Sequence, residues 1–210
     1  RRCRVQCDSQ AIAGLAADHL IAGGFTHFAY AGAPVATNWS RWRQEAFASR
    51  LAEYGHACAV YPGPPARGRA EWERERAAMC GWLAKLPKPV AVFAANDARG
   101  RQVLDACLAA DLPVLYQVAV LGVNNDALIC ETSQPPLSSV AVDVEHAGYA
   151  AAELLDHLMR GTLREPRIIT YQPTGVVRRA STARLPVTDR LVIRALEFIR
   201  INAGLNIRVS

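Results

Sequence analysis

The chain has 210 residues, of which 51% are hydrophobic and 20% are charged, a composition that predicts a globular protein with a sizeable core. No apolar run in it is long enough to cross a bilayer, and the basic N-terminus RRCRVQCDSQ lacks the apolar stretch of a signal peptide. The net charge is +5, and six scattered cysteines without a CxxC pair indicate free, buried thiols in a reducing cytoplasm.

Short apolar runs alternate with helical patterns over the first 160 residues. In chain order, the predicted elements are a helix capped by Asp8 and ended by Gly23-Gly24, a strand at 27–32, a helix at 39–53, a strand at 57–61, a helix at 71–86, a strand at 89–95, a helix at 96–110, strands at 118–123 and 138–142, and a helix at 143–160. The strands are almost continuously apolar, which is typical of strands buried on both faces. The alternation therefore predicts an α/β doubly wound parallel sheet.

The pattern changes after Thr174-Gly175. The polar, basic stretch 178–188 is predicted to be a linker, and 189–200 is predicted to be a helix with one apolar stripe. From Arg160 to Ser210 ten Arg stand against three acidic residues, whereas the rest of the chain is close to neutral. A basic C-terminal region suggests contact with an anion, with nucleic acid the first candidate, but a solvated Arg-rich surface would have the same composition.

Polar and aromatic residues follow three of the predicted strands. In an open parallel sheet, ligands bind beyond the carboxyl ends of the strands. Amides and carboxylates match sugar hydroxyls, Arg offers a planar fork of donors, and Trp offers an apolar face to a sugar ring. These residue types predict a carbohydrate site rather than a phosphate cradle, because no GxGxxG or GxxxxGK[ST] motif is present. The candidate site residues are Trp39, Arg43, Asn96, Asp97, Asn124 and Asn125.

Each candidate also has a purely structural interpretation. Asn96 and Asp97 could only cap the following helix, and Asn124 and Asn125 could only shape a turn. Trp39 could be a core residue, and Arg43 could pair with a surface acid. No GxSxG or HExxH motif is present, so we expect no enzyme, no metal and no cofactor.

Several motifs together resemble the LacI-type regulators, whose effector domain is like a periplasmic sugar-binding protein. The stretch CDSQAIAGLAADHLIAGGFTHFAYAG, the segment WSRWRQEAF, the Asn-Asp of FAANDARG and the segment VAVLGVNND carry the resemblance. The longer stretch AVLGVNNDALICETSQPPLSSVAVD is most similar to the xylose operon regulators, and RRASTARLPVTDRLVIRALEFIRINAGLNIRVS is similar to the junction and first helix of their AraC-type DNA-binding domain. The resemblance covers essentially the whole chain.

The resemblance implies a type I periplasmic-binding-protein-like fold with its N-terminal part missing, followed by the start of an all-α helix-turn-helix domain. It implies a partial sugar-binding domain at 1–177, the linker at 178–188 and a truncated DNA-binding domain at 189–210. Effector contacts are implied at Arg43, at Asn96 and Asp97, and at Asn124 and Asn125. The xylose regulators also carry an aromatic residue in the place of Trp39. The family usually has Asp where this chain has Asn124, which leaves the identity of the sugar open.

The expected function is that of a cytoplasmic, sugar-responsive transcription regulator. A pentose, D-xylose first, would bind in a cleft between two subdomains and control DNA binding by the C-terminal domain of a homodimer with no membrane partner. A sugar receptor of a transport system is an alternative, and a sugar-processing α/β enzyme is a weaker one.

One structural expectation also follows from the resemblance. Strand 138–142 and helix 143–160 should belong to the second subdomain and be poorly buried. The residues that report on this are Val140, Val142, Leu154, Leu155 and Leu158.

Overall fold

The computed structural model describes residues 3–33, 37–61, 69–162, 165–183 and 189–202. Its strands are β1 (Arg4–Cys7), β2 (His27–Ala31), β3 (Cys58–Val60), β4 (Val90–Ala94), β5 (Val118–Asn124), β6 (Ser138–Val142), β7 (Ile168–Tyr171) and β8 (Pro173–Val177). Its α-helices are α1 (Ser9–Ala22), α2 (Asn38–Glu53), α3 (Arg69–Lys85), α4 (Asp97–Ala109), α5 (Ala127–Thr132), α6 (Val144–Met159) and α7 (Arg190–Asn202), and a 3-10 helix spans Ala180–Thr182.

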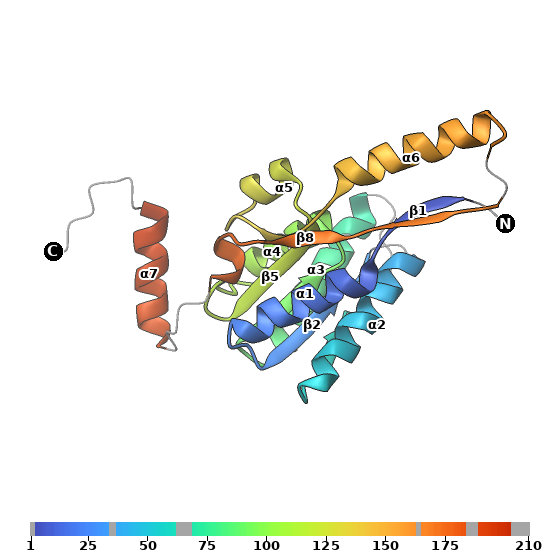
Figure 1. The fold of residues 1–210 in the computed structure, drawn as a ribbon. Helices are drawn as coiled ribbons and strands as arrows, with labels where there is room; N and C mark the ends of the chain where they lie inside the picture. The colour runs from blue at the N-terminus through green and yellow to red at the C-terminus, as the bar shows by residue number, and fades with distance from the viewer. Residues whose placement is uncertain (1–2, 34–36, 62–68, 163–164, 184–188, 203–210) are drawn as a thin grey trace.

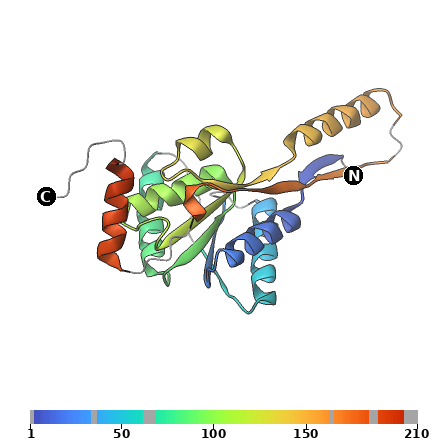
Figure 2. The ribbon, with the colours of Figure 1, turned by 60° about the vertical axis from the view of Figure 1, so that its left-hand side comes forward.

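Two sheets are formed by the described residues. The main sheet has the order β3-β2-β4-β5-β6-β8 and is parallel except for β8, which pairs antiparallel to β6. Strands β1 and β7 pair in parallel as a separate two-stranded sheet. That small sheet and α6 extend from one end of the molecule, whereas α7 lies at the opposite end (Figures 1 and 2). The predicted doubly wound α/β fold is confirmed.

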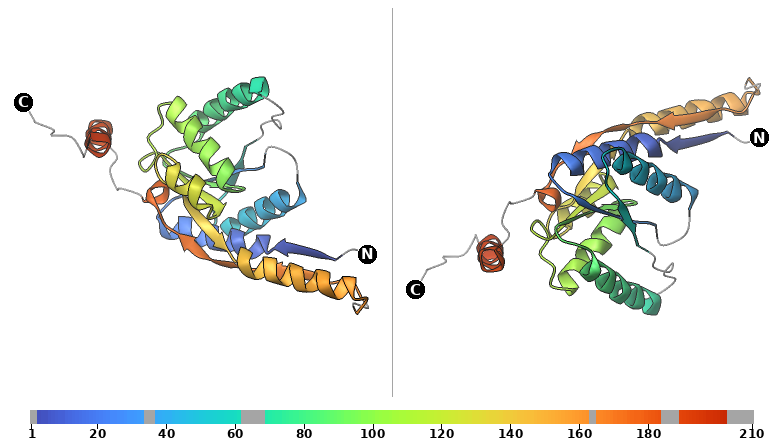
Figure 3. Two further views of the ribbon diagram at one scale, coloured as in Figure 1. Left: turned by 90° about the horizontal axis from the view of Figure 1, so that it is seen from above. Right: turned by 90° about the horizontal axis from the view of Figure 1, so that it is seen from below.

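The main sheet is covered on both faces. Helices α1 and α2 pack on one face and α3 and α4 on the other (Figure 3). Strand β4 shows why its sequence is continuously apolar: Val90 and Val92 join the core on one face, and Ala91 and Phe93 join the core on the other. The buried sheet holds the loops at its carboxyl edge in fixed positions.

Helix starts follow the capping residues of the sequence. The side chains of Asp8, Asn96, Asp126 and Asp143 each accept a hydrogen bond from a backbone N–H of the helix that follows. Helix α1 ends at the predicted Gly23-Gly24, where Gly24 has φ of 75°. The strands predicted at 27–32, 57–61, 89–95 and 118–123 are all present and lie together in the main sheet.

The expectation for the strand at 138–142 was wrong. Strand β6 pairs with β5 in the main sheet, so Val140 is completely buried and Val142 is 8% exposed. The resemblance led us to place this strand on the far side of the crossover between subdomains, but the chain crosses only after Val142. The helix that follows matches the expectation in part, because Leu154 is buried whereas Leu155 and Leu158 are 56% and 47% exposed.

The first described residues of the predicted linker at 178–188 pack against the main sheet. Ser181 is completely buried, donates a hydrogen bond to the Val120 carbonyl and accepts one from the Ser138 N–H. Thr182 is also buried and lies 2.8 Å from the Ser138 hydroxyl. The packed body therefore extends at least to Thr182, and residues 184–188 lie outside the described part. Helix α7 presents the expected exposed apolar residues, including Val192 and Ile199.

Candidate functional site

Three chain crossings lead between the main sheet and the part of the molecule formed by the small sheet and α6, and they lie side by side. They are the β1–α1 turn, the β6–α6 turn and the single residue Gln172 between β7 and β8. The Asp8 N–H donates to the Tyr171 carbonyl, the Gln172 side chain donates to the Asp8 carboxylate, and the Asp143 N–H donates to the Gln172 carbonyl. This hydrogen-bonded bundle joins the two sheets, as a hinge between two subdomains would.

A cavity of about 320 Å³ lies between these crossings and the carboxyl edge of the main sheet. Four of the six sequence-predicted residues line it: Trp39, Arg43, Asn96 and Asn124. The other lining residues are Val5, Gln6, Cys7, Ser9, Trp42 and Tyr171. Strand ends, the start of α2 and the crossings thus meet at one place, where a ligand of an open α/β sheet is expected.

Arg43 is the most constrained residue of the site. Only 2% of it is exposed, and its Nη1 donates to the Ala95 carbonyl just beyond β4. Its Nη2 donates to the Cys7 Sγ at 3.3 Å, and its guanidinium lies over the Trp39 ring, 5.2 Å from the ring centre. Stacking and hydrogen bonds hold the guanidinium plane in one orientation.

Trp39 and Asn96 each combine a structural and a cavity-lining position. Trp39 packs against the core on the α1–α2 face of the sheet, as its structural interpretation expects, and it also lines the cavity. The Asn96 Oδ1 caps α4 by accepting from the Arg99 N–H at 2.8 Å. Because its oxygen is engaged, Asn96 can present its amide nitrogen to a ligand as a donor.

Asp97 does not line the cavity. It is 1% exposed, and its carboxylate accepts hydrogen bonds from the Ser139 hydroxyl at 2.5 Å and from the Asp126 N–H at 2.8 Å. Burial raises the pKa of Asp97 above its ordinary value, although these two hydrogen bonds oppose the shift. Asp97 therefore acts on the site indirectly, by tying the loop after β5 to α4 and β6.

Asn125 is also turned away from the cavity. Its side-chain oxygen accepts a hydrogen bond from Arg179 Nη1 at 2.9 Å, and its N–H donates to the Ser139 hydroxyl. Asn124 and Asn125 both have positive φ, at 110° and 55°, a region that Asn adopts more readily than most residues. This left-handed pair allows Asn124 to reach the cavity while Asn125 faces Arg179.

Sequence reasoning did not find the residues contributed by the small sheet and the crossings. Gln6, Cys7 and Tyr171 sit on strands too short and too irregularly apolar to be recognised, although Cys7 and Tyr171 lie directly beside Asp8 and Gln172 of the hinge. Trp42 lies three residues after Trp39 in the same Trp- and Arg-rich segment. On a helix this spacing places both rings on one face, which is the signal that could have identified Trp42 as a lining residue. Burial raises the pKa of Tyr171, and the neighbouring Cys7 adds to that shift.

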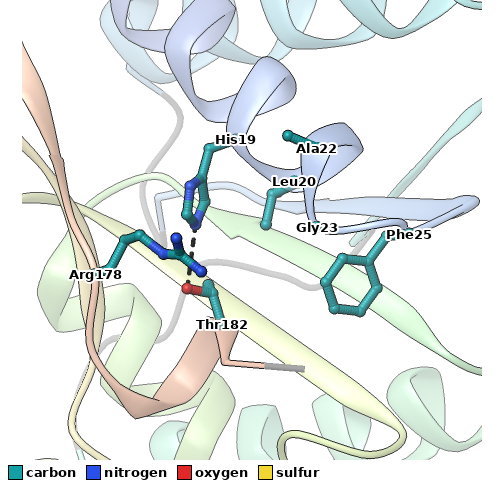
Figure 4. A pocket seen from close by; sticks show the side chains of 7 residues that line it. All are labelled: His19, Leu20, Ala22, Gly23, Phe25, Arg178 and Thr182. Atoms are coloured by element: carbon teal, nitrogen blue, oxygen red, sulfur yellow. Dashed lines mark hydrogen bonds between the residues drawn. The ribbon is translucent and has the colours of Figure 1, made fainter. Parts of the chain in front are cut away.

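A second, smaller cavity of about 100 Å³ lies at the end of α1. Figure 4 shows His19 and Arg178 on its wall. The His19 Nε2 lies 3.1 Å from the Thr182 hydroxyl. Burial, and then the charge of Arg178, lower the pKa of His19. The contact between His19 and Thr182 fastens residues 178–182 to α1.

The described part of the chain contains no group of three His, Cys, Asp or Glu side chains placed to hold a metal ion. All six cysteines are free, and Cys107 and Cys130 are buried, whereas the other four are half-buried. Burial raises the pKa of Cys58, Cys107 and Cys130 to about 12, so these thiols stay protonated at neutral pH. In the described residues no helix is both long and apolar enough to span a bilayer.

Comparison with known proteins identifies the family of the fold. The model of the periplasmic binding protein-like domain matches residues 17–182. The chain belongs to this family. It is 33% identical over 208 residues to the xylose operon regulatory protein of Haemophilus influenzae and 32% identical to that of Escherichia coli K12. Those matches cover 98% of this chain and 54% and 53% of the relatives, so the chain spans about half the length of the curated relatives it matches.

Solved structures show the same family. The structure of the xylose-binding transcription activator xylR superposes with a TM-score of 0.86 at 32% identity, over 97% of this chain and 54% of that one. The complex of the transcriptional regulator CelR with cellobiose superposes with a TM-score of 0.72 at 25% identity, over 86% of this chain and 54% of that one. The periplasmic-binding-protein-like fold predicted from the sequence is therefore confirmed.

Proposed function

We propose that the chain is the effector-sensing part of a sugar-responsive transcription regulator. The observation that carries this proposal is the cavity between the strand ends and the hinge, lined by a stacked Trp39–Arg43 pair and by Asn96 and Asn124. A flat aromatic face beside fixed amide and guanidinium donors matches the apolar face and the hydroxyls of a sugar ring. The matched relatives are named as xylose operon regulators, which supports a regulator rather than an enzyme.

The ligand we propose is a monosaccharide of about pentose size, and D-xylose is the first neutral sugar to test. The cavity of about 320 Å³ lies near the lower end of the range typical of small-molecule sites. Four residues would contact the sugar: Trp39 through its ring, and Arg43, Asn96 and Asn124 through hydrogen bonds. Asp97 and Asn125, which were also expected to touch the effector, would instead hold the β5–α5 loop in place.

Sugar binding would act through the hinge. Cys7 and Tyr171 line the cavity and sit on the crossings between the two sheets, so a ligand in contact with both sides would favour one relative position of the sheets. The packed segment at Arg179–Thr182 leads from the same loop region toward α7. We propose that α7 begins an AraC-type DNA-binding domain, that residues between Thr182 and Asp189 link it to the sensor, and that the protein works as a cytoplasmic homodimer.

The fluorescence of the cavity tryptophans tests the proposed function. Titration with D-xylose and a panel of pentoses should change the emission of the wild-type protein in a saturable way, because Trp39 and Trp42 line the cavity. The Trp39→Phe/Trp42→Phe double variant should lose this change. Trp82→Phe is the matched control, since Trp82 packs on Tyr61 and does not line the cavity, and it should keep the change. A saturable change that survives in the double variant would place the sugar elsewhere.

A transport receptor is a second candidate, because its fold would be the same. The feature that favours regulation over transport is the concentration of Arg residues from Arg160 to Ser210, where ten Arg accompany three acidic residues. A transport receptor would bind sugar with the same cavity but would show no affinity for DNA.

A further inference from the structure

The charge of Arg43 is not neutralised by any described residue. None of the ion pairs among the described residues includes Arg43. Its hydrogen-bond acceptors are the Ala95 carbonyl and the Cys7 thiol, both uncharged groups, and its Nε has no partner in the described structure. A buried guanidinium without a carboxylate is costly to maintain, because desolvation is not offset by an opposite charge.

The neighbouring carboxylates are engaged elsewhere. Asp97 is directed to Ser139 and to the Asp126 N–H. Asp8 is engaged by the Ala11 N–H and by the Gln172 side chain. Neither residue lines the cavity, and the described lining contains no Asp or Glu. The cavity therefore carries the charge of Arg43 with no compensating negative group on its described wall.

The lining also offers donors beside Arg43. The Asn96 oxygen is already occupied by the Arg99 N–H, so its amide nitrogen remains to donate. Arg50 shows how a guanidinium of this chain binds a carboxylate. Its Nε and Nη2 contact the two Asp18 carboxylate oxygens at 2.9 and 3.2 Å. On the same edge of the Arg43 guanidinium, Nη2 donates only to the Cys7 thiol. A thiol is a weak acceptor, so a carboxylate would readily replace it.

We infer that the cavity selects a monosaccharide carrying a carboxylate, an aldonic or uronic acid, over the corresponding neutral sugar. This inference rests on the proposed function and specifies the class of its ligand. The carboxylate would sit at Arg43 beside Cys7, and the sugar hydroxyls would meet the Asn96 and Asn124 amides. A sugar carboxylate is favoured over a sugar phosphate because the described lining provides a single positive charge, which one carboxylate balances.

Calorimetry on matched sugar pairs tests the inference. The pairs are D-xylose with D-xylonate and D-glucose with D-glucuronate, and D-glucose 6-phosphate tests the alternative anion. The acid of at least one pair should bind roughly ten- to a hundred-fold more tightly than its neutral partner, the effect expected of a charge-assisted hydrogen bond. Tighter binding of the neutral member in both pairs would overturn the inference while leaving the proposed function intact. Tighter binding of the phosphate than of both acids would also overturn it, and failure of every sugar to bind would overturn both.

Variants that change charge without truncating Arg43 make the test independent of its structural role. Asn124→Asp places a negative charge on the cavity wall at an exposed position, so it should remove or reverse the preference for the acid. Gln10→Glu is the control, because it adds the same charge at an exposed residue of α1 that does not line the cavity, and it should keep the preference. An unchanged acid preference in Asn124→Asp would contradict the assignment of the carboxylate to this cavity.

Discussion

Asp97 provides the sharpest test of how the site is held together. Its carboxylate accepts from the Ser139 hydroxyl at 2.5 Å and the Asp126 N–H at 2.8 Å, and Asp97 is almost completely buried. Asp97→Ala would remove both hydrogen bonds and leave the Asp126 N–H without its acceptor. Hydrogen bonds to charged groups contribute about 1.5–3 kcal/mol each. Part of that gain is offset by the cost of burying the charge, so we expect a loss of about 2–4 kcal/mol in the free energy of unfolding.

Asp97→Asn is the matched variant for this experiment. An amide can accept from the Asp126 N–H with its oxygen and donate to the Ser139 hydroxyl with its nitrogen, so it keeps both contacts. Urea unfolding at neutral pH should therefore show a loss of less than about 1 kcal/mol for Asp97→Asn. Equal stability of the Ala and Asn variants would show that these two hydrogen bonds do not support the loop.

The difference in stability between the wild type and Asp97→Asn should change with pH in a defined direction. Burial raises the pKa of Asp97 in the folded state above its ordinary value of 3.8. The folded protein then binds this proton more tightly than the unfolded chain, so Asp97 contributes stability that is present below pH 3.8 and is lost as the pH rises through the raised pKa. Lowering the pH through that range should stabilise the wild type relative to Asp97→Asn. A difference that moves the opposite way would contradict the assignment of a raised pKa.

Three further outcomes are expected. Glu75→Ala should lower the free energy of unfolding by about 3–5 kcal/mol in urea, because it leaves Arg99 buried without the carboxylate that lies 2.7 Å from its Nη2. A loss below about 1 kcal/mol would show that the pair is not buried in solution. Gly122→Ala should cost about 1–3 kcal/mol in thermal unfolding, because its Cβ would overlap Asp97 Oδ1 and lie 3.1 Å from Leu137; unchanged stability would refute this close packing. DNA titrations should show weak binding without sequence preference that falls as salt is raised, and a salt-resistant preference for one duplex would contradict this.

Five of the six strands of the main sheet could be predicted because each is a nearly continuous run of apolar or small residues bounded by turn or capping residues. Strand β8 was not predicted, because Thr174 and Gly175 interrupt its apolar residues. The side chains of Asp8, Asn96 and Asp143 cap the helices that were expected to follow them. The placement of strand 138–142 failed for a different reason: an apolar run shows that a strand is buried but not which strand it pairs with. Strand pairing is a long-range property, and β6 uses its run to pair with β5.

The candidate site was predictable to the extent that it follows strand ends. Trp39, Arg43, Asn96 and Asn124 were found because residues after parallel strands converge at one edge of the sheet. The direction of the Asp97 and Asn125 side chains could not be predicted, since it depends on the Ser139 hydroxyl and on Arg179, which come from distant parts of the chain.

Binding of a sugar by wild-type protein and by Arg43→Ala is the measurement that tests the account most directly. Arg41→Ala is the matched control, because Arg41 lies on the same helix, is largely exposed and pairs only with Glu45 among the described ion pairs. Calorimetry with the tightest-binding sugar of the neutral and acidic panel should show affinity reduced roughly ten- to a hundred-fold in Arg43→Ala and unchanged in Arg41→Ala, with both variants folded by circular dichroism. Equal affinity of Arg43→Ala and the wild type would remove Arg43, and with it the proposed cavity, from sugar recognition.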